Sequence, residues 1–477
     1  MSIYFKCPVA ARCGGCQMTK LPYQEQLRVK QRRMEELLRP FCSVEPIRGM
    51  DAPLHYRNKV HAVLAVDKSG LPISGVYAAG THRVVPVKHC QIEDERADRI
   101  IHSIVEMLPR FRLKIYNEYT HRGFLRHIVI RTGQVTGQIM VVLVTTSLEF
   151  PGKKEFVSAL VQKHPEITTI VVNENARQTS MVLGNRESVL YGNGYMEDEL
   201  CGKRFRISPR SFYQVNAQQA EVLYETAIEM MGLTGRETLL DAYCGTGTIG
   251  LCASDHVHKL IGVELNADAV KDARINAQAN NVRNATFYCD DAGRFMTRMA
   301  KEGHVPDVVC MDPPRSGSDV PFLTAVKTLA PEKIVYVSCG PDTLARDLEF
   351  LCKDGQYQVV RAVPVDMFPC TEHVETVVLL SKGEIDSKKV KVEFSMENMD
   401  MSGFQKGATY EQIKAYMMEH SGLKVSSLYI AQVKQKYGII ERENYNRSKS
   451  ENAKQPQCPK EKEEAIVEAL KHFEMIF

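Results

Sequence analysis

The chain has 477 residues and a net charge of +3, which excludes a strongly basic protein. Its residues are 44% hydrophobic and 25% charged, as in a soluble globular protein. Its length predicts two to four domains. No apolar run approaches the roughly 18 residues that a membrane helix needs. The start, MSIYFKCPVA, lacks the apolar core of a signal peptide, so we expect a cytoplasmic protein whose 14 cysteines are reduced thiols or metal ligands.

The N-terminal segment, residues 1–43, joins a cysteine-rich start to a helical stretch over 23–41. CPVAARCGGCQ places Cys7, Cys13 and Cys16 at C-x5-C-x2-C spacing. A fourth ligand must come from a distant position, for which Cys90 in PVKHCQI is the natural candidate. Four thiolates suit zinc or an iron–sulfur cluster, and the spacing by itself leaves both open.

Residues 44–205 predict a β-rich domain. HIVIRTGQVTGQIMVVLVTT indicates two strands around a glycine-containing turn, and TTIVVNE indicates another strand. In HYRNKVH and FLRHIVIR, cationic residues are interleaved with aromatic and apolar ones, which suits an RNA surface. These cations are Arg57, Lys59, Arg126 and Arg131. The alternative is a pair of ordinary amphipathic strands with charged outer faces.

Strands alternate with helices from residue 206 to residue 385, after the helical stretch AQQAEVLYETAIEMMGL. This alternation predicts a parallel, doubly wound, Rossmann-like sheet. Residues 386–477 form a further region. A Met-rich linker extends to about 408, and three stretches with helical periodicity then predict a small helical domain.

The first strand–turn–helix of this sheet, LLDAYCGTGTIGL, predicts a cofactor site. Gly245 and Gly247 let the backbone approach a ligand closely, but the pattern is neither GxGxxG nor a phosphate-binding loop. Glu264 ends the next strand, where a carboxylate can accept hydrogen bonds from both ribose hydroxyls, and Asp291 follows the third strand, where it can read an adenine amine. Together they favour a nucleoside cofactor without a phosphate tail, S-adenosylmethionine, over a dinucleotide.

The following strand ends carry candidate catalytic residues. Asp312 in MDPPRSG precedes a rigid Pro-Pro shelf, Cys339 ends VYVSCGP, and Glu375 lies in HVETVVLL. A thiolate that adds to carbon-6 of a pyrimidine makes carbon-5 nucleophilic, and a carboxylate can then remove the carbon-5 proton. Each residue also has a non-catalytic interpretation. Cys339 could be a buried structural thiol, and Glu375 could be a surface or helix-capping carboxylate.

These motifs resemble the RNA (uracil-5-)-methyltransferase family of the RumA/TrmA type. The resemblance covers about residues 1–382, most specifically FYQVN, DAYCGTG, GVE, DPPRSG, VSCGPDTLARDL and HVETVVLL. It implies a class I S-adenosylmethionine-dependent methyltransferase sheet in the C-terminal half, with Cys339 as the nucleophile and Glu375 as the proton acceptor. It also implies six cofactor-contacting residues: Gln214, Tyr243, Thr248, Glu264, Asp291 and Asp312.

The branch of that family that acts on 23S ribosomal RNA is similar at the N-terminal cysteines. The resemblance therefore implies a [4Fe–4S] cluster on Cys7, Cys13, Cys16 and Cys90, and 23S ribosomal RNA as the preferred substrate. We expect a monomer with no obligate protein partner and no membrane association. Residues 421–460 hold eight Lys/Arg and three Glu, so SSLYIAQVKQKYG and the basic NYNRSKSENAK predict a further RNA contact.

Four alternatives to this function stay open. The same chemistry could act on transfer RNA. A cytosine-5 methyltransferase is disfavoured because DPPRSG carries no cysteine after its shelf. An amino-methyltransferase would leave Cys339 and Glu375 without a role. A non-catalytic iron–sulfur RNA-binding protein would not need that pair either.

Overall fold

The computed structural model describes residues 5–78, 80–178, 181–383, 410–421, 423, 425–437, 458–472 and 475. Contacts divide the chain into two units, Met1–Ser387 and Lys388–Phe477. The linker predicted for 386–408 and the NYNRSKSENAK tract lie outside the described residues. The predicted boundaries at residues 43 and 205 stay predictions, because the contacts do not divide the first unit further.

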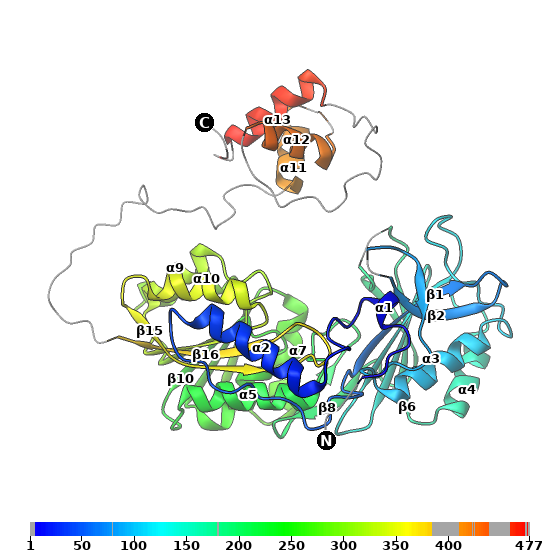
Figure 1. Cartoon of the computed structure of the whole chain (residues 1–477), viewed down its shortest axis with the longest axis horizontal. Coiled ribbons are helices and arrows are strands. Elements are labelled where there is room, and N and C mark those ends of the chain that lie inside the picture. The colour runs from blue at the N-terminus through cyan, green and yellow to red at the C-terminus, as the bar shows by residue number, and fades with distance from the viewer. Residues whose placement is uncertain are drawn as a thin grey trace. The chain divides into compact units, whose positions relative to one another are not determined.

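The first unit contains two seven-stranded sheets (Figure 1). The sheet nearer the N-terminus has the order β3-β2-β1-β4-β5-β6-β7, and only its β5–β6 pair is parallel. Its helices α3 (Glu95–Met107) and α4 (Lys153–Lys163) bury one apolar face of the sheet. The strands are β1 (Lys59–Val66), β2 (Pro72–Tyr77), β3 (Val84–Pro86), β4 (Leu125–Thr132), β5 (Ile139–Thr145), β6 (Ile167–Glu174) and β7 (Arg186–Tyr191). The hairpin and the strand predicted from 127–146 and 168–174 are confirmed as β4, β5 and β6.

The second sheet is the predicted Rossmann-like sheet, with the order β12-β11-β10-β13-β14-β16-β15. Its strands alternate with helices, as the sequence predicts. The strands are β10 (Thr238–Ala242), β11 (Lys259–Glu264), β12 (Ala285–Cys289), β13 (Val308–Met311), β14 (Lys333–Ser338), β15 (Tyr357–Val365) and β16 (Glu375–Lys382). The helices are α5 (Ala217–Met231), α6 (Thr248–Ala253), α7 (Ala267–Ala279), α8 (Ala292–Lys301), α9 (Val320–Leu329) and α10 (Pro341–Cys352).

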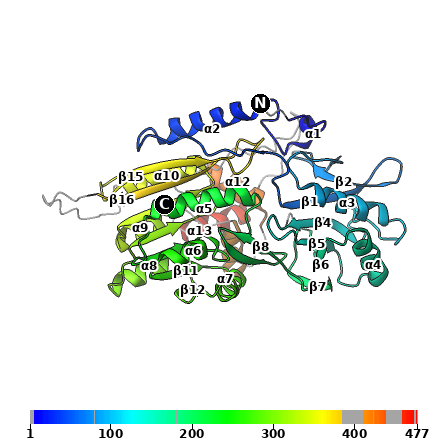
Figure 2. The same ribbon diagram turned by 90° about the horizontal axis from the view of Figure 1, so that it is seen from below.

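Helices cover both faces of this sheet, because successive strand residues point to opposite sides. Leu239 packs with α5, α6 and α7, while the next residue, Leu240, packs with α8, α9 and α10. Helix α2 (Tyr23–Leu38) joins the second group through Met34 and Leu38. Figure 2 shows α2 lying along α10 and the edge strands β15 and β16. Helix α2 therefore belongs to the core of the Rossmann-like sheet.

The last strand departs from the parallel arrangement that the alternation predicts. β16 pairs antiparallel with both β14 and β15. The segment between β15 and β16 contains no helix, and an antiparallel neighbour does not need a crossover helix. As a result β16 begins at the edge of the sheet where β10 to β14 end.

The remaining elements are short. Helix α1 (Ala10–Cys13) lies in the cysteine-rich segment. The hairpin of β8 (Met196–Leu200) and β9 (Lys203–Ile207) packs against the apolar core of the Rossmann-like sheet. In the second unit the three predicted helices are confirmed as α11 (Tyr410–His420), α12 (Ser427–Lys436) and α13 (Lys460–His472). They enclose an apolar core of their own, which includes Ile413, Ile430 and Leu470.

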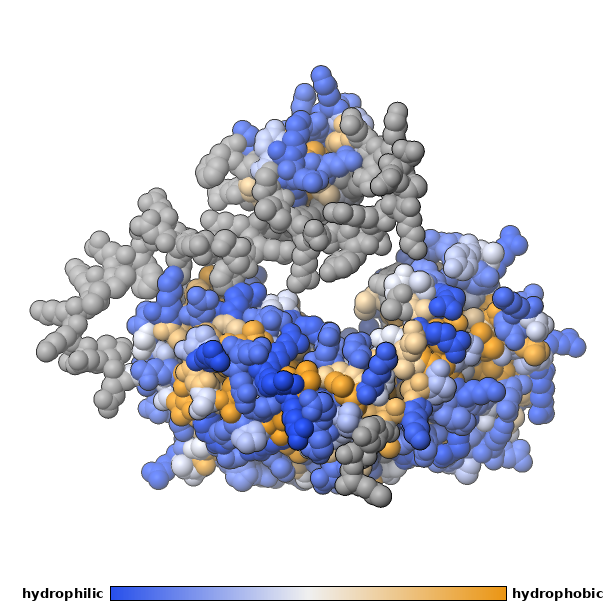
Figure 3. All heavy atoms as spheres, viewed as in Figure 1, coloured by the Kyte–Doolittle hydropathy of each residue, from blue (hydrophilic) through white to orange (hydrophobic). Residues whose placement is uncertain are grey.

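Hydrophilic side chains cover most of the face of the molecule that Figure 3 shows, with small apolar areas between them. Such a mixture is ordinary for a protein surface. Within the described residues, no helix is both long and apolar enough to cross a membrane.

Candidate active site

The predicted site residues gather along one edge of the Rossmann-like sheet. We call it the catalytic sheet from here on. Tyr243 follows β10, Glu264 ends β11, Asp291 follows β12, Asp312 follows β13 and Cys339 follows β14. Glu375 joins them from the opposite direction, because it is the first residue of the antiparallel β16. The carboxyl edge of an open parallel sheet is the usual place for a ligand.

The glycine-rich loop after β10 is held by two carboxylates. The backbone N–H of Gly250 donates to Asp241 across 2.9 Å, and the N–H of Gly245 donates to Glu264 across 3.2 Å. Burial raises the pKa of the Asp241 carboxyl to about 7. A methyl group on Gly250 would lie 2.8 Å from an Asp241 oxygen, so a larger residue here would force the Asp241 side chain to move. The loop is thus shaped before any cofactor binds.

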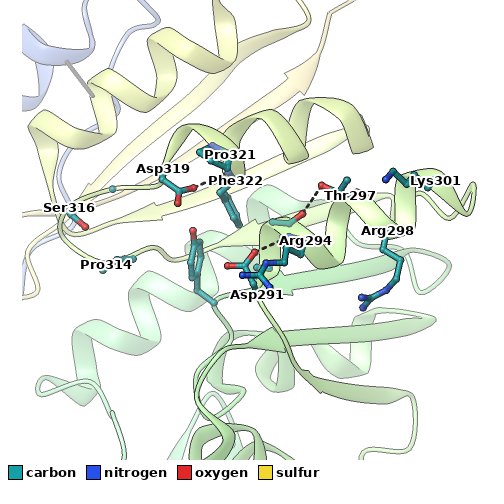
Figure 4. Close-up of a pocket in the computed structure, with 14 residues that line it drawn as sticks. Asp291, Arg294, Thr297, Arg298, Lys301, Pro314, Ser316, Asp319, Pro321 and Phe322 are labelled. Atoms are coloured by element: carbon teal, nitrogen blue, oxygen red, sulfur yellow. Dashed lines mark hydrogen bonds between the residues drawn. The ribbon is translucent and has the colours of Figure 1, made fainter. Parts of the chain in front are cut away.

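A cavity of about 800 Å³ opens beside Tyr243 and Asp291 (Figure 4). The rings of Tyr243 and Phe322 are 4.7 Å apart at an angle of 33°. Asp291 caps helix α8 by accepting a hydrogen bond from the N–H of Arg294 across 2.9 Å. The wall therefore combines apolar ring surface with a fixed carboxylate, which suits a flat heteroaromatic group such as adenine.

Tyr224 on α5 links two other predicted cofactor residues. Its hydroxyl is 3.2 Å from the Thr248 hydroxyl. The Gln214 side chain is also among the groups that act on the pKa of this hydroxyl, and it opposes the rise that burial causes. Tyr224 is fully buried, and burial raises the pKa of its hydroxyl well above the usual range, with the nearby Asp312 acting in the same direction. Gln214, Thr248 and Asp312 therefore lie around one buried tyrosine.

Cys339 and Glu375 lie at neighbouring ends of paired strands. Ser338 pairs with Thr376 across the antiparallel strands β14 and β16, so Cys339, one residue after Ser338, and Glu375, one residue before Thr376, both lie at the open edge. Burial raises the pKa of Glu375 to about 8; Asp312 acts in the same direction and Arg315 opposes it. Burial also raises the pKa of the Cys339 thiol to about 11, and Glu375 contributes to this shift. The two groups share one largely desolvated site.

The four predicted cluster ligands lie in one neighbourhood. Cys16 and Cys90 pack against an apolar cluster that contains Tyr56 and Cys370. The charge of Glu93 acts to raise the pKa values of three of the thiols, those of Cys13, Cys16 and Cys90. Cys7 and Cys16 both act on the Cys13 thiol. Thiols are suitable donors for zinc or an iron–sulfur cluster, so the donor set fits. In the part of the chain that the structure describes, no three His, Cys, Asp or Glu side chains are arranged to hold a metal ion.

Two of the four predicted RNA-surface cations are buried, which makes that prediction wrong for them. Arg126 is 3% exposed and donates to the carbonyls of Asn175 and Arg177 and to the Glu118 carboxylate. Arg131 is also 3% exposed and donates to the carbonyl of Pro209. Strand periodicity identified charged positions on β4 but not that other parts of the chain cover them.

Two residues of the site, Phe322 and Tyr224, were not predicted from the sequence, and Phe212 is a third candidate beside it in sequence. Phe322 and Tyr224 lie on helices, where an aromatic residue in the sequence indicates only packing in the core. Phe212 lies two residues before Gln214. Its side chain is 68% exposed, whereas phenylalanine side chains are usually buried. Its place within FYQVN was the one available signal.

Comparison with known proteins identifies the family. The family model described as tRNA (uracil-5-)-methyltransferase matches residues 22–383. The chain belongs to this family. The predicted resemblance is confirmed at that level, and the chain is an RNA methyltransferase that uses S-adenosylmethionine to methylate carbon-5 of uracil.

Relatives agree with this assignment. Uncharacterized RNA methyltransferases of Bacillus cereus and Clostridium tetani are 40% and 42% identical over 384 and 379 residues, covering 80% and 79% of this chain and 83% and 82% of theirs. The solved structure of the Pyrococcus abyssi tRNA (uracil-54, C5)-methyltransferase with S-adenosyl-L-homocysteine is similar, with a TM-score of 0.63 and 26% identity, and the match covers 77% of this chain and 85% of that one. The helical unit that begins at Lys388 lies beyond the family match.

Proposed function

We propose that this methyltransferase modifies a uridine of 23S ribosomal RNA through a covalent adduct to Cys339. When bound, S-adenosylmethionine supplies the methyl group. Gln214, Tyr243, Thr248, Glu264, Asp291 and Asp312 hold it at the carboxyl edge of the catalytic sheet. The cavity beside Tyr243, Phe322 and Asp291 takes the adenine, and Glu264 accepts from the ribose hydroxyls.

Cys339 and Glu375 divide the chemistry between them. The Cys339 thiolate adds to carbon-6 of the uracil ring, and the electron pair displaced from the ring makes carbon-5 nucleophilic. Once carbon-5 carries the methyl group, the Glu375 carboxylate removes the remaining carbon-5 proton. The carbon-6–sulfur bond then breaks and returns the thiolate. Because the uracil must be unstacked to reach Cys339, the substrate is a flipped or single-stranded nucleotide.

The observation that carries this proposal is the pairing of Ser338 with Thr376, which brings Cys339 and Glu375 to one edge. An amino-methyltransferase would not need a thiol and a buried carboxyl at these places. The exposed ring of Phe212, close in sequence to Gln214, offers a surface on which an unstacked base can rest.

Nucleoside mass spectrometry tests the reaction. Anaerobically purified protein is incubated with S-adenosylmethionine and either 23S ribosomal RNA or transfer RNA from a strain that lacks the gene. We expect 5-methyluridine in the ribosomal RNA, its loss in Cys339→Ala, and its retention in Cys352→Ala, a half-buried cysteine at the far end of α10. Product on transfer RNA alone would favour the substrate of the Pyrococcus relative, and methylcytosine would refute the uracil mechanism.

We also propose that Cys7, Cys13, Cys16 and Cys90 hold a [4Fe–4S] cluster. The support is that Cys13, Cys16 and Cys90 lie near Glu93, that Cys7 lies near Cys13, and that four thiols suit such a cluster. The cluster would stabilise the N-terminal segment and position RNA, with no redox step in methylation. Iron and sulfide are measured in anaerobically purified wild-type protein and in Cys13→Ser, with Cys352→Ser as the control. About four irons per wild-type chain, lost in Cys13→Ser alone, is the expected result; stoichiometric zinc would refute it.

A further inference from the structure

The loop between β9 and α5, residues 208–216, carries both Phe212 and Gln214. We call it the platform loop. The Phe212 ring is largely exposed, whereas the residues on either side of it, Ser211 and Tyr213, are buried. Burial of a phenylalanine ring is favourable, so a loop that was free to rearrange would cover it. The backbone of this loop is therefore held by contacts that do not involve the ring.

Arg131 on β4 holds the first half of the platform loop. Its guanidinium donates to the carbonyl of Pro209 across 3.3 Å and to the carbonyl of Ser211. Within the described residues, both hydrogen bonds of this side chain go to the loop, and its Nε makes none. Burial lowers the pKa of Arg131 to about 10, which leaves it a cation at pH 7. A buried cation is costly unless its donors are satisfied, so Arg131 and the loop carbonyls stabilise one another.

Asn58, the residue before β1, holds the second half of the platform loop. Its side-chain amide donates to the carbonyl of Gln214 across 3.0 Å, and its backbone N–H donates to the carbonyl of Val215 across 2.8 Å. Asn58 is itself fixed to β4, because its carbonyl accepts from the N–H of Thr132 across 2.9 Å. Thr132 follows Arg131 directly in the chain. Asn58 and Arg131 therefore form one brace, which the first sheet applies to the carbonyls of the loop.

The part of the unit that contains the catalytic sheet holds the same loop through other groups. The Ser211 hydroxyl donates to the Asp272 carboxylate of α7 across 2.8 Å. Asn216, which caps α5, donates to the carbonyl of Met367 across 3.0 Å. The platform loop is thus tied to both sheets, and none of these bonds involves the Phe212 ring.

We propose that Asn58 and Arg131 are positioning residues for methyl transfer. They hold the platform loop so that Gln214 meets the cofactor and the Phe212 ring meets an unstacked base of the RNA. The proposal rests on the proposed function for these two contacts. A loop that is ordered before binding loses less conformational freedom when its ligands bind, which raises their affinity. Neither positioning residue touches cofactor or RNA itself, in agreement with the burial of both side chains.

A fluorescent reporter tests whether Asn58 holds the loop. The chain contains no tryptophan, so Phe212→Trp places a single one on the platform loop of the full chain. Adding Asn58→Ala should lower the fluorescence anisotropy of this tryptophan. The matched control is Asn173→Ala, which removes a buried amide of β6 that donates to the carbonyl of Gly184 across 3.0 Å. Adding this control substitution should leave the anisotropy unchanged.

Cofactor binding gives a second readout, in chains that keep Phe212. Calorimetry should show S-adenosylmethionine bound about five- to tenfold more weakly by Asn58→Ala and with wild-type affinity by Asn173→Ala. Both variants lose a buried hydrogen bond, so both should melt at a lower temperature. Unchanged anisotropy or wild-type affinity in Asn58→Ala would make its bond merely structural and overturn the proposal.

Arg131 provides the same test if Asn58→Ala does not fold. Arg131→Lys keeps a cationic donor for the loop carbonyls, whereas Arg131→Met keeps none. The lysine variant should therefore bind S-adenosylmethionine more tightly than the methionine variant. Equal affinities would overturn the proposal.

Binding and methylation separate this proposal from the function beneath it, because neither readout needs RNA or product. If Asn58→Ala lowers both anisotropy and affinity while wild-type protein forms no 5-methyluridine, the positioning role stands and the proposed function fails. If wild-type protein forms the product and Asn58→Ala keeps both values, the function stands and the positioning role is wrong.

Discussion

The ammonium group of Lys30 donates to the carboxylate of Asp366 across 2.5 Å, and both side chains are almost completely buried. Tyr23 also donates to Asp366, and Gln26 accepts from the backbone N–H of Cys370. Tyr23, Gln26 and Lys30 share one face of α2, because they lie three and four residues apart. This face of the N-terminal helix holds the segment that leads into Glu375.

Loss of the Lys30 charge should destabilise the first unit strongly. Lys30→Met leaves the buried Asp366 carboxylate without its cation, which typically costs about 3 to 5 kcal/mol. The control is Arg33→Met, which breaks an exposed ion pair with Asp342 and should cost less than about 1 kcal/mol. Urea midpoints of both variants measure the difference, and equal midpoints would contradict this account of the pair.

Replacement of Glu375 should trap the covalent intermediate. Glu375→Gln keeps the shape of the side chain but removes the base, so proton removal from carbon-5 slows while thiolate addition continues. We expect a protein–RNA adduct that survives denaturing electrophoresis. Cys339→Ala should form none. Full turnover by Glu375→Gln without an adduct would show that another group removes the proton.

The rate of methylation should rise with pH. Glu375 must be ionised to accept the proton, and burial raises its pKa to about 8. The Cys339 thiol, whose pKa burial raises to about 11, also reacts in its ionised form. Single-turnover rates at saturating RNA should therefore increase between about pH 6 and pH 8. A profile that is flat over this range would argue against both roles.

The stability of the first unit should fall as pH rises, whereas the rate of methylation should increase. Glu375 has a folded-state pKa of about 8, against an ordinary value of 4.5. The protonated Glu375 carboxyl contributes fully to stability below its pKa in the unfolded chain. This contribution is lost as pH rises toward its pKa in the folded protein, at about 1.4 kcal/mol per pH unit. Glu375→Gln does not ionise. Its melting temperature relative to wild type should therefore increase from pH 5 to pH 8, and a constant difference would count against the shift.

Asp291 should separate cofactor recognition from helix capping. Asp291→Asn keeps an oxygen that accepts from the N–H of Arg294, whereas Asp291→Ala loses the cap at a cost of about 1 kcal/mol. Both variants lose the carboxylate, so calorimetry should show binding of S-adenosylmethionine weakened by roughly tenfold or more. Only the alanine variant should melt at a lower temperature. If Asp291→Asn binds S-adenosylmethionine as tightly as the wild type does, the Asp291 carboxylate does not recognise the adenine.

Local patterns in the sequence were enough to locate the catalytic sheet and its open edge. Glycines such as Gly245 mark a turn because few other residues adopt its conformation, and strand ends such as Glu264 and Cys339 follow from apolar runs that stop at polar residues. Strand ends of a parallel sheet share one edge, so the line of residues from Asp291 to Cys339 could be predicted without coordinates.

The tertiary structure alone decided what covers these elements. No local pattern shows that β16 runs antiparallel and starts with Glu375 beside Cys339, that Lys30 meets Asp366, or that Arg126 is buried on carbonyls near residue 175. Alternation along a strand assigns side chains to two faces, but burial of each face depends on contacts far away in the chain. The sequence thus determined the sheet and its chemistry, and long-range packing determined which charges reach the site.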